Sequence, residues 1–155
     1  MKVKEVKSYL LNPGWGKNLL FVKIATDNGL VGWGECYTQS DRDKTIVTHL
    51  EHMSKYLKGR DPFEIKYFNQ IIFDDYASRR GSMEIFSALS GIEQALWDIC
   101  GKETKQPVYN LLGGPSRGKL RVYANGWYAG ALVPEDYAEK AKKTIDKGFT
   151  ALKFD

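Results

Sequence analysis

The segment from Leu120 onward restricts the fold most, because it alternates strand and helix patterns. The string "LRVYANG" is typical of a strand, residues 134–147 carry apolar positions four apart as a helix does, and "GFTALKFD" is again typical of a strand. Two strands joined through a helix in this way run parallel and form a βαβ unit. One unit cannot cover both faces of a parallel sheet. We therefore expect a second domain that begins here and is not completed within the chain.

The first third of the sequence predicts a different kind of sheet. Alternating apolar residues flank Asn28-Gly29, which can supply the two positive-φ residues of a tight hairpin turn, so residues 17–36 are typical of a β-hairpin. A further strand over residues 3–11 would complete a three-stranded antiparallel meander. The string "NPGWGKN", residues 12–18, lies between the first two strands and is expected to be an irregular loop.

Helical patterns follow the meander. Apolar residues recur at helical spacing from Ile46 to Leu57, Asp61-Pro62 resembles a helix start, and Ser82 can cap a long helix that runs to about residue 102. Together with the meander these helices predict an α+β domain over residues 1–118. The boundary falls in "GGPSRGK", and residues 119–155 form the second domain, which stops after its second strand.

Composition and charge exclude several function classes. The net charge is +4, from 23 basic and 19 acidic residues that are mixed along the chain, so no basic stripe suggests nucleic-acid binding. No apolar run approaches the roughly 18 residues that span a membrane, and the first residues do not resemble a signal peptide. We therefore expect a cytoplasmic protein that binds neither nucleic acid nor a membrane.

Neither the cysteines nor the histidines predict a metal site. Cys36 and Cys100 lack the short spacing of a metal or redox motif, so two reduced, buried thiols are expected. His49 and His52 lie three apart on a predicted helix. Because no third ligand is near them in sequence, we interpret them as an exposed helical pair.

The closing strand carries the chemistry. Residues two apart in a strand share a face, so Lys153 and Asp155 would point together, while Leu152 and Phe154 would pack on the covering helix. If the parallel sheet closes into a (β/α) barrel, the charged pair faces its interior at the end where such barrels hold their active sites. The spacing leaves open an ion pair that only fills the mouth of the barrel.

Several strings resemble one known family over essentially the whole chain. The strings "GLVGWGE", "SALSGIEQALWDICGKETKQPVYNLLGG", "VYANGWY" and "GFTALKFD" resemble the mandelate racemase and muconate lactonizing enzyme group of the enolase superfamily. The last two resemble most the gluconate and galactonate dehydratases of that group. The resemblance implies a capping domain over residues 1–118, followed by the first βαβ unit of an incomplete TIM-type barrel.

The resemblance also implies a reaction and a cofactor. Members bind Mg²⁺ through carboxylates of later barrel strands and abstract the proton next to a substrate carboxylate. A sugar-acid dehydratase then expels the neighbouring hydroxyl to give a 2-keto-3-deoxy acid. The metal ligands are expected downstream of Asp155, so these 155 residues alone should neither bind Mg²⁺ tightly nor turn over substrate.

Two residues of the closing strand are the implied catalytic groups. Many relatives carry Lys-x-Lys here with the second Lys as the base, but this chain has Asp155 at that position. Lys153 is then expected to stabilise the ene-diolate, while Asp155 or a later His moves the proton. A neighbouring carboxylate favours the charged form of a lysine, which suits this electrostatic role.

The implied substrate contacts lie on two loops. In this family a mobile loop between the first two strands confers specificity, so Trp15 and Lys17 would close over a sugar acid. Asn125 and Tyr128 follow the first barrel strand and would line the mouth of the site. An ordinary surface loop for Trp15, and plain packing for Tyr128, are the alternatives.

Other functions stay open at this point. The same ene-diolate could lead to racemization or cycloisomerization, and the chain could also be a non-catalytic capping or assembly module. Members of the family are commonly oligomeric, so a homo-oligomer is expected.

Overall fold

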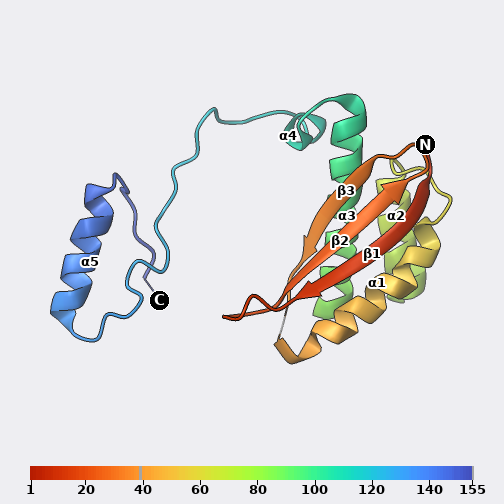
Figure 1. The fold of residues 1–155 in the computed structure, drawn as a ribbon. Helices are drawn as coiled ribbons and strands as arrows, with labels where there is room; N and C mark the ends of the chain where they lie inside the picture. Colours follow the sequence, from red (N-terminus) through yellow and green to blue (C-terminus); the bar gives the residue numbers. More distant parts are fainter. Residues whose placement is uncertain (39, 155) are drawn as a thin grey trace. The chain divides into compact units, whose positions relative to one another are not determined.

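The computed structural model describes residues 1–38 and 40–154. The chain divides into two compact units, Met1–Gly114 and Pro115–Asp155, which are described separately (Figure 1). None of the described helices combines the length and the apolar character needed to cross a membrane.

The first unit contains the expected antiparallel meander. Its sheet has the order β1-β2-β3, formed by β1 (Val3–Leu11), β2 (Leu19–Thr26) and β3 (Val31–Cys36). The loop of residues 12–18 connects β1 to β2, as expected. Along β2 buried and more exposed residues alternate, which places Leu20, Val22 and Ile24 on the inner face, each 0% exposed.

The turn between β2 and β3 differs from the expected one. Gly29 has a φ of +89°, whereas the described non-glycine residues with positive φ are Ser78, Arg79 and Lys105, so Asn28 is not among them. The Gly29 amide donates to the Thr26 carbonyl, and the Thr26 amide donates to the Leu30 carbonyl. The expectation of two positive-φ residues was therefore wrong. One glycine suffices, because the loop is one residue longer than a two-residue turn.

Helices cover one face of the sheet (Figure 1). The helices of this unit are the short 3₁₀-helix η1 (Ser40–Arg42), α1 (Asp43–Leu57), α2 (Ile65–Ile71) with its π-helical extension η2 (Ile72–Tyr76), α3 (Met83–Thr104) and α4 (Val108–Leu111). The last of these, α4, packs against α3 and does not lie on the sheet. The hydrophobic core lies between the sheet and α1, α2 and α3. Its largest side chains include Phe68, Met53, Leu50, Ile92 and Leu96.

Helix α3 begins where the sequence predicts, and helix α2 does not. Ser82 caps α3 as expected, and its Oγ accepts a hydrogen bond from the Ile85 amide at 3.3 Å. The helix predicted to begin at Asp61-Pro62 begins only at Ile65. The Asp61 carboxylate accepts instead from the Phe63 amide at 3.0 Å, and this contact closes a separate turn before the helix.

The backbones of α3 and β3 approach each other closely. A Cβ atom built on Gly32 would lie 2.0 Å from the Ala95 carbonyl oxygen, and one built on Gly34 would lie 2.0 Å from the Gly91 carbonyl oxygen. A Cβ on Gly91 would in turn lie 2.4 Å from the sulfur of Cys36. Because no side chain fits between the two elements, glycine is required on both of them.

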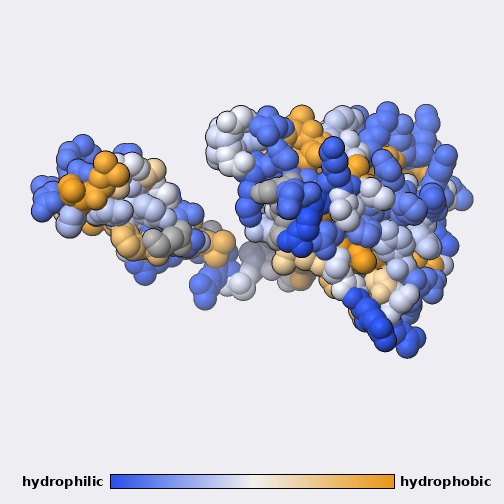
Figure 2. All heavy atoms as spheres, turned by 90° about the horizontal axis from the view of Figure 1, so that it is seen from below, coloured by the Kyte–Doolittle hydropathy of each residue, from blue (hydrophilic) through white to orange (hydrophobic). Residues whose placement is uncertain are grey.

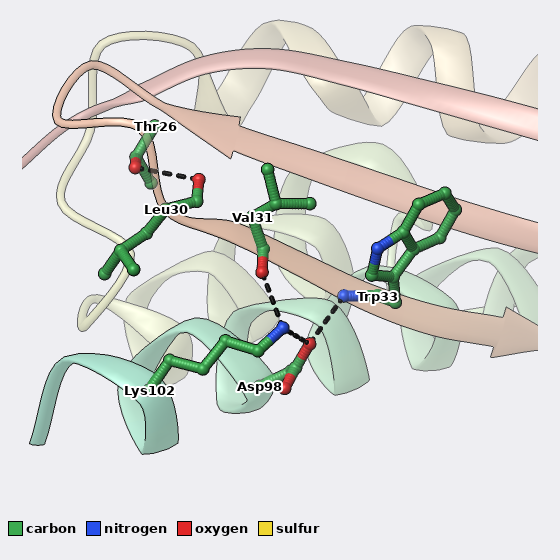
Figure 3. A network of polar contacts seen from close by, with 6 residues as sticks. All are labelled: Thr26, Leu30, Val31, Trp33, Asp98 and Lys102. Atoms are coloured by element: carbon green, nitrogen blue, oxygen red, sulfur yellow. Dashed lines mark hydrogen bonds and ion pairs between the residues drawn. The ribbon is translucent and has the colours of Figure 1, made fainter. Parts of the chain in front are cut away.

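Side chains of α3 also pair with the free edge of β3 (Figure 3). Asp98 Oδ2 accepts from the Trp33 amide at 2.9 Å and from Lys102 Nζ at 2.7 Å, and Lys102 Nζ also donates to the Val31 carbonyl at 2.7 Å. One turn earlier, the Gln94 amide exchanges two hydrogen bonds of 3.1 Å with the backbone of Glu35. These side chains replace a fourth strand and protect an edge that could otherwise pair with another chain.

The second unit contains the expected helix and only a trace of the expected strands. Helix α5 (Pro134–Asp146) begins with a proline in its first turn. Around it, Ala124 and Leu152 form one isolated parallel bridge. The parallel direction agrees with a βαβ connection, but no extended strand or barrel forms within the described part of this unit.

Several large apolar side chains of the second unit are exposed, in agreement with the hydrophobic residues visible at the surface in Figure 2. They include Leu120, Val122, Leu132 and Phe154. One bridge between two residues is too small a sheet to bury these side chains against a second layer.

The close approach of α3 and β3 leads us to expect that a side chain at Gly34 destabilises the fold. Replacing Gly34 with Ala should lower the free energy of unfolding by about 3 kcal/mol, because the new methyl group meets the helix backbone and not a movable side chain. The measurement is urea unfolding followed by circular dichroism. Gly118→Ala is the matched control: Gly118 has open space around it and no positive φ, so its change should stay within about 0.5 kcal/mol. Equal stability of the two variants would contradict the close packing.

Candidate functional site

The β1–β2 loop displays Trp15 at the surface of the first unit. Gly14 and Gly16 have φ values of +82° and +64°, and the Asn12 side chain accepts from the Gly14 amide at 2.7 Å. These contacts fold the loop into a tight turn. Trp15, between the two glycines, is 79% exposed. An exposed indole at a loop tip can contact a ligand without disturbing the core.

Lys17 lies at the end of the same loop and contacts Tyr37. Its Nζ donates to the Tyr37 hydroxyl at 2.8 Å and lies 4.5 Å from the centre of the phenol ring. Sequence reasoning missed Tyr37, although the hairpin register contains the signal. Leu20 pairs with Cys36, so the residue after Cys36 must lie beside the loop that precedes Leu19.

The base of the loop is tied to the helical layer. Thr38 Oγ donates to the Asn18 carbonyl at 2.5 Å, and Asn18 Nδ2 donates to Asp43 Oδ2 at 2.9 Å. Asp43 is the first residue of α1 and is buried, and a carboxylate at this place is stabilised by the helix dipole. Ser87 of α3 donates through its Oγ to the Tyr37 carbonyl at 2.7 Å. The loop and the segment after β3 are therefore held as one structure.

In the second unit, Lys153 lies next to the parallel bridge. Its amide donates to the Ala124 carbonyl at 2.8 Å, and its carbonyl accepts from Trp127 Nε1 at 2.7 Å. The Lys153 residue is exposed. Asp155, the other residue expected to be catalytic, lies outside the described residues.

Aromatic rings surround the bridge. Tyr128 is half-buried and lies 5.4 Å from Trp127, 5.4 Å from Phe154 and 6.4 Å from Tyr137 of α5, measured between ring centres. Phe154 lies 5.6 Å from Tyr137, so it packs on the covering helix as expected. Tyr128 thus has a packing role. Asn125 accepts through Oδ1 from the Gly126 amide at 3.0 Å, which shapes the turn after the bridge.

The structure brings the expected residues together in two groups. Trp15 and Lys17 share the loop of the first unit, and Asn125, Tyr128 and Lys153 share the region around the bridge in the second unit. Each group is therefore described by the hydrogen bonds and ring contacts of its own unit.

The cysteines are free and buried, as the sequence predicts. Burial raises the pKa of the Cys36 thiol to about 12 and that of Cys100 to about 11. Both sulfurs therefore stay in the protonated form near neutral pH and are poor nucleophiles.

The two histidines lie in different environments. His49 Nδ1 lies 2.7 Å from the Tyr76 hydroxyl and is half-buried, whereas His52 is exposed. The expectation of two exposed histidines was therefore right only for His52, because η2 packs its tyrosine against α1. Within residues 1–38 and 40–154, no three His, Cys, Asp or Glu side chains gather in a way that could hold a metal ion.

The chain is similar to proteins of known families. The family model described as the N-terminal domain of mandelate racemase / muconate lactonizing enzyme matches residues 16–113. Over 161 aligned residues the chain is 40% identical to the D-gluconate/D-galactonate dehydratase of Picrophilus torridus, which covers 99% of this chain and 40% of that protein. It is 38% identical over 153 residues to the D-galactonate dehydratase of Pectobacterium atrosepticum, covering 99% and 38%.

A solved structure supports the same relationship. The crystal structure of an enolase from Agrobacterium radiobacter, bound to Na and L-malate, superposes with a TM-score of 0.83 at 32% identity. The match covers 98% of this chain and 38% of that one. The chain thus spans about two fifths of the length of the relatives that it matches.

The partial burial of His49 leads us to expect that stability depends on pH. Burial lowers the pKa of the His49 imidazole below its ordinary value of 6.5, although the Glu84 carboxylate acts in the opposite direction. The unfolded chain therefore binds a proton more readily than the folded one. The contribution of His49 to stability is complete above pH 6.5 and is lost as the pH falls below that value.

The check is urea unfolding between pH 7.5 and pH 5 in wild type and in His49→Gln. The stability of the variant should fall less steeply with decreasing pH, because it has no imidazole to protonate. His52→Gln removes an exposed imidazole from the same helix and should keep most of the wild-type slope. Parallel curves for wild type and His49→Gln would contradict the prediction.

Proposed function

The chain belongs to the mandelate racemase/muconate lactonizing enzyme family of the enolase superfamily, and we propose that it forms the N-terminal part of a sugar-acid dehydratase. One observation carries this proposal: 99% of the chain aligns at 40% identity with a relative that is named D-gluconate/D-galactonate dehydratase. The proposed substrate is a small sugar acid of the gluconate or galactonate type.

The proposed domains follow the sequence boundary. The meander and its helices, residues 1–118, fit the capping domain of the family. Residues 119–155 would begin the barrel, with α5 as its first helix. The single parallel bridge between Ala124 and Leu152 supports this assignment, because it has the direction that a βαβ unit requires.

The proposed reaction removes one water molecule. A base takes the proton on the carbon next to the carboxylate, and the electron pair of that C–H bond forms an ene-diolate. The ene-diolate then expels the neighbouring hydroxyl, which leaves as water after a general acid has protonated it. The enol product rearranges to a 2-keto-3-deoxy acid.

Lys153 has the electrostatic role in this proposal. Its ammonium would stabilise the negative charge that develops on the carboxylate oxygens of the ene-diolate. The backbone contacts with Ala124 and Trp127 support this role because they fix the residue on both sides of its Cα. Asp155, or a histidine outside this chain, would be the base.

Four residues are proposed as substrate contacts, and each is argued from its own unit. Trp15 and Lys17 would contact the substrate from the capping loop, where Lys17 supplies a positive charge and Trp15 an exposed apolar surface. Asn125 and Tyr128 would contribute from the turn after the bridge. For Tyr128 this contact would come from its hydroxyl, since its ring is packed among other rings.

The described residues do not fit a magnesium site. Members of the enolase superfamily generally use Mg²⁺, which stabilises the ene-diolate when it is bound. Carboxylates are the protein ligands that this ion prefers. No cluster of such ligands exists among the described residues. In this proposal the ligands of the ion lie outside them.

The test of the function is a substrate panel. Protein expressed from its complete gene is incubated with Mg²⁺ and a set of sugar acids, and 2-keto-3-deoxy acids are measured as products. We expect dehydration of D-gluconate, D-galactonate or both, and its loss when the metal is removed with EDTA. Exchange of the α-hydrogen with deuterated solvent in the absence of keto-acid formation would instead indicate a racemase. Absence of both reactions would favour a non-catalytic module.

A lysine variant tests the proposed catalytic role. Lys153→Gln should lower kcat about 100- to 1000-fold, because the side chain keeps hydrogen-bonding groups but loses its charge. Lys143→Gln is the control, since Lys143 is an exposed lysine of α5 that pairs only with Glu139 in the described structure. It should keep wild-type kcat. Equal activity of the two variants would remove Lys153 from the mechanism.

A further inference from the structure

Tyr37 connects Lys17 to the core of the first unit. Its carbonyl accepts from Ser87 Oγ of α3 at 2.7 Å, and its hydroxyl accepts from Lys17 Nζ at 2.8 Å. Ser87 is buried, and it lies on the same helix that packs against β3. A continuous series of contacts therefore runs from α3 through Tyr37 to the ammonium of Lys17 in the β1–β2 loop.

We infer that Tyr37 is a positioning residue that holds the Lys17 ammonium ready for an anionic, oxygen-rich ligand, and that its own hydroxyl donates to the same ligand. The inference rests on the proposed function for the identity of that ligand, a sugar acid. The arrangement of Tyr37 and Lys17 does not depend on it.

The hydrogen-bond donors of the pair support the inference. A lysine ammonium has three donors, and in the described structure Lys17 uses one of them, on the Tyr37 hydroxyl. Because that hydroxyl accepts from Lys17, its own hydrogen is available for a further acceptor. The pair thus offers several donors and one positive charge side by side. Carboxylate and hydroxyl oxygens of a sugar acid are acceptors that match this set.

A second cation–tyrosine pair shows what is unusual about the first. Arg60 donates to the Tyr67 hydroxyl at 2.9 Å and lies 4.3 Å from its ring centre, but it also forms an ion pair with Glu64 at 3.2 Å. Among the described residues, Lys17 has no carboxylate partner. The charge of Arg60 is compensated within the fold. Within residues 1–38 and 40–154, the ammonium of Lys17 is held in place by Tyr37 and forms no ion pair, which suits a site for an anion.

Kinetics test the role of Tyr37. Tyr37→Phe keeps the ring and removes the hydroxyl, so we expect KM to rise about five- to tenfold while kcat stays within about twofold. Lys17→Gln should raise KM further. Adding Tyr37→Phe to Lys17→Gln should cause a smaller loss than Tyr37→Phe causes in wild type, because the lysine is already removed and only the hydroxyl's own contact with the ligand is left to lose. Fully additive effects, or a loss confined to kcat, would overturn the positioning role.

Tyr67→Phe is the matched control, since it removes the hydroxyl from the other cation–tyrosine pair. It should leave KM unchanged. Folding of Tyr37→Phe is expected to be intact because Tyr37 is 58% exposed and, among the described residues, its hydroxyl forms a hydrogen bond with Lys17 alone. Circular dichroism of each variant verifies this before the kinetics.

A labelling experiment separates this inference from the proposed function. Lys17 is acetylated with an amine-reactive ester, and the rate is read by peptide mass spectrometry. Tyr37→Phe should raise the rate about threefold, because the ammonium loses its hydrogen bond, while Tyr67→Phe should leave it unchanged. D-gluconate, as the probe, should slow acetylation of Lys17 in wild type. Failure to turn over any substrate would contradict the proposed function and leave the Tyr37–Lys17 arrangement untouched. An unchanged acetylation rate in Tyr37→Phe would overturn the positioning role. Absence of protection by D-gluconate would overturn the assignment of the ligand.

Discussion

Contact between the backbones of α3 and β3 is the constraint on which the rest of the first unit depends. Gly32 and Gly34 face α3 where no Cβ can be accommodated, and Gly91 faces β3 in the same way. Such a contact fixes the position of the helix along the strand, because a shift by one residue would place a side chain in the gap. The fixed register then lets Gln94, Asp98 and Lys102, four residues apart on α3, meet successive backbone groups of the β3 edge. Figure 3 shows the contacts of Asp98 and Lys102.

The same register positions the candidate ligand contacts of this unit. Ser87 lies one turn before Gly91 and reaches the residue that follows β3, so α3 holds Tyr37 as well as the sheet. The base of the β1–β2 loop is fixed independently, because Asn18 forms a hydrogen bond with the buried Asp43. Lys17 is therefore constrained from two sides, by its own loop and by Tyr37. Hydrogen bonds to buried groups hold a loop more firmly than contacts between exposed side chains do.

Sequence patterns predicted the elements that depend on local chemistry. The meander, the Ser82 cap, the long helix α3 and α5 follow from periodicity and capping residues, and the structure contains all of them. The errors arose where two local solutions compete. Asp61-Pro62 can begin a helix or close a turn, and the turn prevails here. Asn28-Gly29 allows a two-residue or a longer hairpin loop, and periodicity does not separate the two.

The candidate site was harder to predict because its contacts join distant positions. Tyr37 gains its role from Lys17, which lies twenty residues earlier in the sequence, and only the pairing register brings the two together. The parallel strands of the second unit depend even more on neighbours, since a parallel pair is stable only inside a larger sheet that is covered on both faces. In the described part of this unit, the parallel pairing consists of one bridge between Ala124 and Leu152.

Lys17 and Lys153, the two candidate cations, therefore differ in how well the surrounding structure fixes them. Lys17 is connected to a core whose central side chains are fully buried, and its position follows from that of α3. Lys153 depends on one parallel bridge, the Trp127 indole and a ring cluster whose outermost member, Phe154, is 64% exposed. Local opening requires less free energy where few apolar contacts are buried. The geometry around Lys153 is thus more sensitive to whatever packs on the second unit, whereas the Lys17–Tyr37 pair is set by the first unit alone.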